Sequence, residues 1–175
     1  MPVRFQEGGG MTRTRVFYED WQMECCGTPF AVGDEVAWRL VAVDALAPRG
    51  EYYGAGAWVE NHGGPEHETT GRVRAIDLVH QEYLAHHDPL AVTHPVPEPG
   101  TLVLRGTGRR MEPVPGAHTL EPVDDCPKWF DAFEDEEPPP RQVPFRVRRA
   151  IGVLATLDVT PDVPDGTPQQ PRDPH

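Results

Sequence analysis

The alternation of apolar and polar residues with a period of two predicts that this chain is built mainly of β-strands. The pattern is longest in Phe145–Val159, where only Arg149 interrupts it. This segment predicts one long strand with one buried face, and Gly152 marks the point where we expect the strand to bend or bulge. We expect the strand to close a sheet that the N-terminal strands form.

Shorter stretches of the same pattern predict the remaining strands. A turn at Gly33 and Asp34 separates two apolar alternations, as is common where small β-barrels begin. Residues 19–27 are predicted to form a connection or one helical turn, and residues 60–70 a polar surface loop. The predicted strands are residues 12–18, 36–40, 40–43, 52–59, 101–105 and 118–123.

One segment, residues 72–84, fits both a strand and a helix. Val73, Ala75 and Val79 have the spacing of one face of a strand. Val79 and Tyr83 are four residues apart, as on one face of a helix. We predict a strand as far as about Val79, followed by a short helix or an irregular end.

These elements predict a mainly β fold, a small antiparallel barrel or sandwich of the SH3-like or OB-like kind, with at most one or two short helices. Residues 12–160 form the single β-rich domain, and Met11 is an alternative start to Met1. Composition marks two segments that we expect not to pack, an unstructured leader at 1–11 and a disordered tail at 161–175. Within the domain, residues 124–140 are an acidic, proline-rich loop or insertion.

The chain is acidic, with a net charge of −12 from 28 acidic and 16 basic residues. A protein that binds nucleic-acid phosphates needs a basic face, so we expect no nucleic-acid partner. The same charge disfavours anionic membranes, and no stretch is apolar enough to span a bilayer. Three cysteines, two of them adjacent, do not make a disulfide framework, so we expect a cytoplasmic protein with reduced thiols.

Residues 18–40 are the densest part of the sequence in groups that build a core or carry chemistry, and they contain Cys25 and Cys26. Thiolate and imidazole ligands hold Zn²⁺ tetrahedrally, and the polar loop offers His62 and His67. A zinc site of these four residues is therefore one hypothesis. Adjacent cysteines are not the spacing of a standard zinc module, however. The alternative is one thiol buried as a small apolar group and its neighbour facing solvent.

Signals for catalysis are few. The sequence contains no serine, which excludes every serine hydrolase. The glycines in YYGAGAW lack the third glycine and the following helix of a phosphate-binding loop. Asp20 with Glu19 is either a pair of acids with raised pKa values or a turn beside a packed Trp21.

The acidic segment 124–137 has seven acids in fourteen residues, together with three aromatic side chains. The aromatic residues have the spacing of one face of a short helix. They either fold back onto the barrel or form a docking element for a basic groove of a partner protein. The residues of this docking element are Trp129, Phe130, Phe133, Glu134, Asp135 and Glu136.

Three stretches, YEDWQMECCGTPFAVGDEVAW, YYGAGAWVENHGG and GRVRAIDLV, resemble an uncharacterised family of actinobacterial proteins classed only as a domain of unknown function. The likeness covers about residues 13 to 160. It implies one domain, and it brings no activity, substrate or catalytic residue.

Two interpretations of function follow. The leading one is a non-enzymatic, cytoplasmic β-barrel protein that acts through protein interaction, because the chain has an acidic-aromatic segment and no complete catalytic set. It expects no cofactor. The alternative is a zinc metalloprotein, with a hydrolytic enzyme as one form, in which Cys25, Cys26, His62 and His67 lie near one ion.

Overall fold

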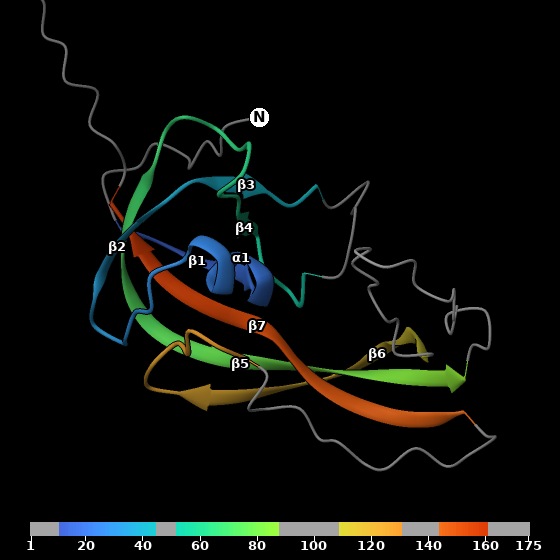
Figure 1. The fold of residues 1–175 in the computed structure, drawn as a ribbon. Coiled ribbons are helices and arrows are strands. Elements are labelled where there is room, and N and C mark those ends of the chain that lie inside the picture. Colours follow the sequence, from blue (N-terminus) through green and yellow to red (C-terminus); the bar gives the residue numbers. More distant parts are fainter. Residues whose placement is uncertain (1–10, 45–51, 88–108, 131–143, 161–175) are drawn as a thin grey trace, which may run out of the picture.

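The longest alternating segment of the sequence forms the strand around which the sheet is arranged. In the computed structural model of the protein, Phe145–Val159 is strand β7, which pairs along its length with β5 (Thr69–His87) and along its second half with β1 (Thr12–Glu19). Figure 1 shows β5 and β7 as two long, curved neighbours. The structure describes residues 11–44, 52–87, 109–130 and 144–160.

Seven strands and one short helix make up the described part of the chain. No helix in that part is long and apolar enough to cross a membrane. The remaining elements are α1 (Asp20–Cys26), β2 (Glu35–Trp38), β3 (Leu40–Ala42), β4 (Ala57–Val59) and β6 (Arg109–Val123).

The strands form a nearly closed, barrel-shaped mixed sheet in the order β2-β5-β7-β1-β4-β3, and β6 also pairs with β5. All pairings among the described strands are antiparallel except β1 with β4, which is parallel. The prediction of a small β-barrel with few helices is therefore confirmed, with one parallel pair that the sequence did not indicate. Helix α1 lies against β1 and β7 (Figure 1).

The predicted bulge in β7 is confirmed. The pairing with β5 shifts between Val79, which opposes Gly152, and His80, which opposes Ala150. Ile151 is therefore the extra residue. Gly152 has φ 146°, and a Cβ there would lie 2.3 Å from the backbone oxygen of Tyr18. Only glycine allows β1 to approach this closely.

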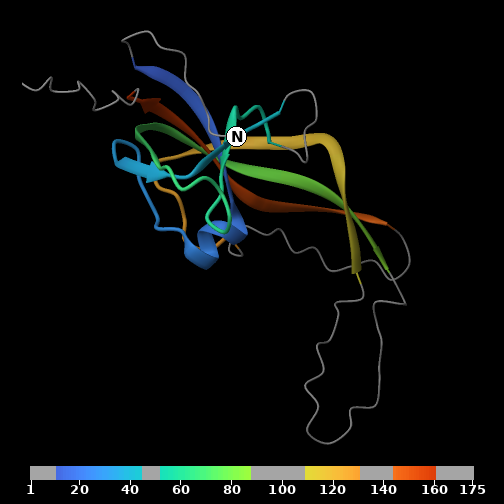
Figure 2. The same ribbon diagram turned by 90° about the horizontal axis from the view of Figure 1, so that it is seen from above.

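Strand β6 carries a second irregularity, where residues 114–117 have no partner on β5. Figure 2 shows that β6 bends sharply. The buried side chain of Gln81 donates hydrogen bonds to the carbonyl oxygens of Val114 and Ala117. The amide thus satisfies backbone groups that the ladder leaves unpaired.

Two sequence predictions about strands are wrong. Residues 52–59 form a strand only at β4, because a turn closed by Ala55 N–H donating to Tyr52 O precedes it and Tyr53 has φ 55°. Residues 72–84 contain no helix, because β5 pairs with β7 as far as Ala85 and with β6 as far as His87. The predicted strand at 101–105 lies outside the described residues, as do the leader up to residue 10 and the tail from 161.

The core contains a group of aromatic rings that explains the sequence signal around Trp38. The Trp38 ring lies 5.3 Å from the ring of Tyr18 and 4.8 Å from that of Phe30, centroid to centroid. All three side chains are buried. Edge-to-face contacts of this kind stabilise a core beyond the area that they bury.

A carboxylate ties three strands together at one end of the sheet. Asp158 of β7 is buried and accepts hydrogen bonds from Arg13 of β1 at 2.9 Å and from Arg74 of β5 at 2.6 Å. The hydrogen bond from Arg13, followed by that from Arg74, lowers the pKa of Asp158 below its usual range. The carboxylate is therefore ionised wherever the protein is folded at neutral pH.

We predict that Gly152→Ala destabilises the fold by about 3 kcal/mol or more, because the new Cβ clashes with the β1 backbone at a positive φ. Gly116→Ala has a positive φ of 71° but no atom within 4 Å of the new Cβ, so it isolates backbone strain and should cost about 1 kcal/mol. Gly63→Ala, with open space and no positive φ, should stay within about 0.5 kcal/mol. Urea unfolding measures all three, and equal losses would contradict the close approach.

Candidate metal centre

Helix α1 follows β1 directly, and its C-terminus is held by a lysine. Gly27 N–H donates to the carbonyl oxygens of Gln22 and Met23 and so ends the helix. Lys128 Nζ donates to Met23 O at 2.6 Å and to Gly27 O at 2.9 Å. A cation at the C-terminus of a helix satisfies carbonyls that have no partner within the helix. Lys128, the only lysine of the chain, therefore fixes the end of α1.

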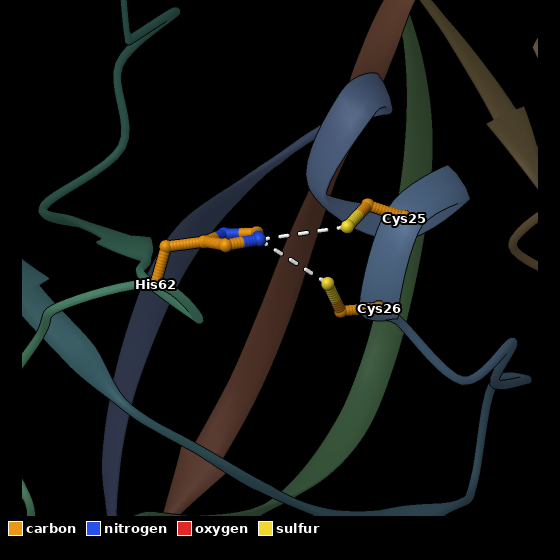
Figure 3. Close-up of side chains that lie close together, drawn as sticks. All are labelled: Cys25, Cys26 and His62. Atoms are coloured by element: carbon orange, nitrogen blue, oxygen red, sulfur yellow. Dashed lines mark hydrogen bonds between the residues drawn. The ribbon is translucent and has the colours of Figure 1, made fainter.

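The last two residues of α1 place both adjacent thiols beside one imidazole. Cys25 Sγ lies 3.5 Å from His62 Nε2, and Cys26 Sγ lies 3.3 Å from the same nitrogen. Figure 3 shows the two sulfur atoms and the ring pointing toward one another. The three atoms lie within 4.8 Å of one another, and all three side chains are exposed.

The buried side chain of Gln22 holds the loop that carries His62 against α1. Its Nε2 donates to Val59 O at 2.9 Å, and its Oε1 accepts from Asn61 N–H at 2.8 Å. Asn61 Nδ2 in turn donates to the Tyr18 hydroxyl at 3.0 Å. Gln22 thus binds the end of β4 on both sides of Glu60, and His62 follows directly.

Two further contacts fix the position of His62. The backbone N–H of His62 donates to Glu60 Oε1 at 2.8 Å. Its ring stacks on the indole of Trp21, with centroids 5.1 Å apart and planes inclined by 29°. Trp21, for which the sequence offered a packed position beside a turn, is 47% exposed. Its contact is with the candidate site instead.

The two sulfur–nitrogen separations fit one tetrahedral zinc ion. Zn–S distances of about 2.3 Å and Zn–N distances of about 2.0 Å at a tetrahedral angle separate sulfur from nitrogen by roughly 3.5 Å. The separations of 3.5 Å and 3.3 Å between His62 Nε2 and the two Sγ atoms are close to this value. The arrangement can accept a thiophilic cation with small side-chain movements.

Cys25 affects the protonation of its neighbour Cys26. A hydrogen bond with Cys25 is the largest cause that raises the pKa of the Cys26 thiol, and desolvation adds to it. The ammonium group of Lys128 acts in the opposite direction. The third cysteine, Cys126, is buried in the core, and burial raises the pKa of its thiol to about 12. Cys126 is therefore a small apolar core residue and not a ligand.

The acids that precede Trp21 do not form a paired site. Asp20 begins α1 and accepts the N–H of Trp21 at 2.7 Å, while Glu19 is the last residue of β1. Burial is the largest cause that raises the pKa of Asp20 to about 6, and the nearby carboxylates of Glu24 and Glu19 raise it further. The start of α1 takes the place of the predicted turn, and the raised pKa of the first interpretation is found at Asp20.

Three of the four predicted zinc ligands meet, and one does not. Cys25, Cys26 and His62 form the group, whereas His67, which is exposed on the loop before β5, lies outside it. Gln22 and Lys128, which position the ligands, were missed by the sequence analysis. Only Lys128 had a signal in the sequence, because it is the single lysine of the chain.

The acidic-aromatic segment divides between core and surface. Phe130 is 2% exposed and folds back into the core, and its N–H donates to Glu24 Oε1 of α1. Trp129 next to it is 62% exposed. The other predicted docking residues lie outside the described part of the chain; they are Phe133, Glu134, Asp135 and Glu136.

We predict that Gln22→Leu destabilises the protein by about 2 kcal/mol, because it leaves Val59 O and Asn61 N–H without partners. It should also shift the NMR signals of the His62 ring away from their positions over Trp21. Gln81→Leu is the matched control, since it removes another buried amide without contact to the site. An unchanged His62 signal in Gln22→Leu would contradict the role of Gln22 in holding the His62 loop against α1.

Comparison with known proteins identifies a family but assigns no activity. No curated protein and no solved structure matches the chain. A family model described as a family of unknown function, DUF6578, matches residues 12–159. The match covers every strand and the helix, including Cys25, Cys26 and His62. The chain belongs to the family of unknown function DUF6578.

Proposed function

We propose that the protein binds one zinc ion through Cys25, Cys26 and His62. The observation that carries the proposal is the approach of both Sγ atoms to the same His62 nitrogen, at 3.5 Å and 3.3 Å. Thiolate and imidazole groups are the ligands that zinc prefers, and two thiolates neutralise its charge.

The loop geometry supports binding because the ligands are already held in place. Gln22, Asn61 and Trp21 fix the position of the His62 ring before any metal arrives. Residues around the ligands that hold them in position strengthen metal binding, since less order has to be created on binding. A metal would displace the protons of the Cys25 and Cys26 thiols.

Three protein ligands leave one coordination position for solvent or for another molecule. Closed structural zinc sites have four protein ligands, whereas sites that exchange ligands or catalyse keep one position open. All three ligand side chains are exposed, so that position faces solvent. A hydrolytic activity would use water bound at this position, whose pKa the metal lowers.

We predict that untagged protein takes up about one zinc ion per chain in competition with a chromophoric chelator. Cys25→Ser, Cys26→Ser and His62→Gln should each weaken zinc binding by about 100-fold, because each removes a ligand. His67→Gln is the matched control and should leave the affinity unchanged. Wild-type protein with under about 0.1 zinc per chain, or equal loss in His62→Gln and His67→Gln, would contradict the site.

A second function, protein interaction, is favoured by one exposed tryptophan, which follows the lysine that contacts α1. Trp129 is 62% exposed and lies beside Lys128, whose Nζ is 5.7 Å from the centre of the indole ring. Exposed tryptophans are enriched at the centres of protein interfaces. Lys128 and the buried Phe130 hold Trp129 at the surface, so the ring is presented on a fixed backbone.

We predict that Trp129→Ala lowers the recovery of bound partners at least about fivefold in pull-downs from cells that express the protein. Leu120→Ala removes another exposed apolar side chain, 37% exposed on β6, and should leave recovery unchanged. A deletion of 124–137 is unsuitable, because it removes the core residues Cys126 and Phe130. The same partners at the same level in all three proteins would contradict the interaction surface.

A further inference from the structure

A pocket of about 430 Å³ opens beside the candidate metal centre, and Cys26 is among its lining residues. Its volume lies in the range of small-molecule sites. Cys26, Tyr18 and Asn61 line one end, and the turn before β2 together with β2 itself lines the other. The pocket is therefore formed by the end of β1, the segment that connects β1 to β2, and β2 itself.

Three aromatic residues form the wall of the pocket. Tyr18, Phe30 and Trp38 all line it, and their rings contact one another at centroid distances between 4.8 Å and 6.3 Å. Because each of these side chains is also buried in the core, the wall is rigid. Aromatic faces carry partial negative charge and attract organic cations.

Two carboxylates also line the pocket. Asp34 and Glu35 line the pocket and are exposed, and Asp34 Oδ2 accepts the N–H of Ala31 at 2.8 Å, which fixes its position. None of the described lining residues is a lysine, arginine or histidine.

The nearest positive charge on a neighbouring strand is Arg72 of β5, which opposes Glu35 in the β2–β5 register. Among the described residues, the two side chains form no ion pair. The pocket therefore combines aromatic lining residues with two carboxylates that no ion pair within the described residues holds.

We propose that this pocket binds a small organic ammonium ion, with the charged nitrogen toward Asp34 and Glu35 and the apolar part against Phe30 and Trp38. An aromatic wall with adjacent carboxylates selects cations over neutral or anionic molecules of the same shape. The ammonium site goes beyond zinc binding: it shares Cys26 with the proposed metal site, but the carboxylates and rings that would hold the ammonium ion are not metal ligands.

A series of three probes with the same ring and similar length tests the charge selection: 2-phenylethylamine, 2-phenylethanol and 3-phenylpropionate. Binding is measured by NMR titration of protein treated with a chelator, and repeated with zinc present. We expect the amine to bind at least about tenfold more tightly than the alcohol, and the carboxylate to bind most weakly. Equal binding of the three probes, or no binding of the amine, would overturn the proposal.

Two variants test whether the amine binds in this pocket. Glu35→Gln should weaken the amine about fivefold or more without affecting the alcohol, because it removes one charge from an exposed side chain. Glu66→Gln removes one charge from an exposed residue outside the pocket and is the matched control. Equal effects of both variants would show attraction to the net charge of the protein alone and would overturn the pocket.

The same titrations separate this proposal from the zinc proposal. If the chelator-treated protein binds the amine, the pocket functions whether or not zinc binds to Cys25, Cys26 and His62. If zinc binds and the amine does not, the ammonium site is wrong and the metal site stands.

Discussion

The buried side-chain amide of Gln22 is the interaction on which the candidate site depends. It pairs with a carbonyl oxygen and an N–H group on the chain that leaves β4, and both would otherwise be left without partners in a buried position. A single amide thus joins α1 to a segment 37 and 39 residues away in the sequence. Because the same helix ends in Cys25 and Cys26 and the same segment continues to His62, this contact decides whether thiols and imidazole meet.

The barrel supplies the framework for that contact. Strand β1 runs into α1 without a loop, so the position of the helix is set by the pairing of β1 with β7. The pairing ends at Glu19 opposite Gly152, next to the bulge, where the backbones approach most closely. At the other end of the helix Lys128 binds the last carbonyl oxygens. The site is therefore built on elements that are fixed at both ends, as a preorganised site requires.

The sequence predicted strands well where one face of the strand is buried. It predicted them poorly where pairing with distant strands decides how far a strand extends. The alternation in Phe145–Val159 reported both the strand and its bulge, because burial and glycine leave a local signal. The extension of β5 to His87 left no such signal, since it depends on pairing with two distant strands. The parallel pairing of β1 with β4 depends on tertiary structure in the same way.

The same distinction applies to the candidate site. Residue type alone suggested Cys25, Cys26 and His62, because few side chains bind zinc. The alternative interpretation, one thiol buried and its neighbour facing solvent, is wrong because both cysteines are exposed. Both lie in the last turn of α1, beside a loop that brings the imidazole to them. The roles of Gln22 and Lys128 could not be predicted, because an amide and an amine reveal their partners only in three dimensions.

The most direct measurement of the central claim is zinc K-edge X-ray absorption spectroscopy of untagged protein loaded with one equivalent of zinc. Binding at Cys25, Cys26 and His62 predicts two sulfur neighbours at about 2.3 Å, together with nitrogen or oxygen neighbours at about 2.0 Å. A spectrum with nitrogen and oxygen neighbours only would contradict the site, because it would place the ion away from both thiols.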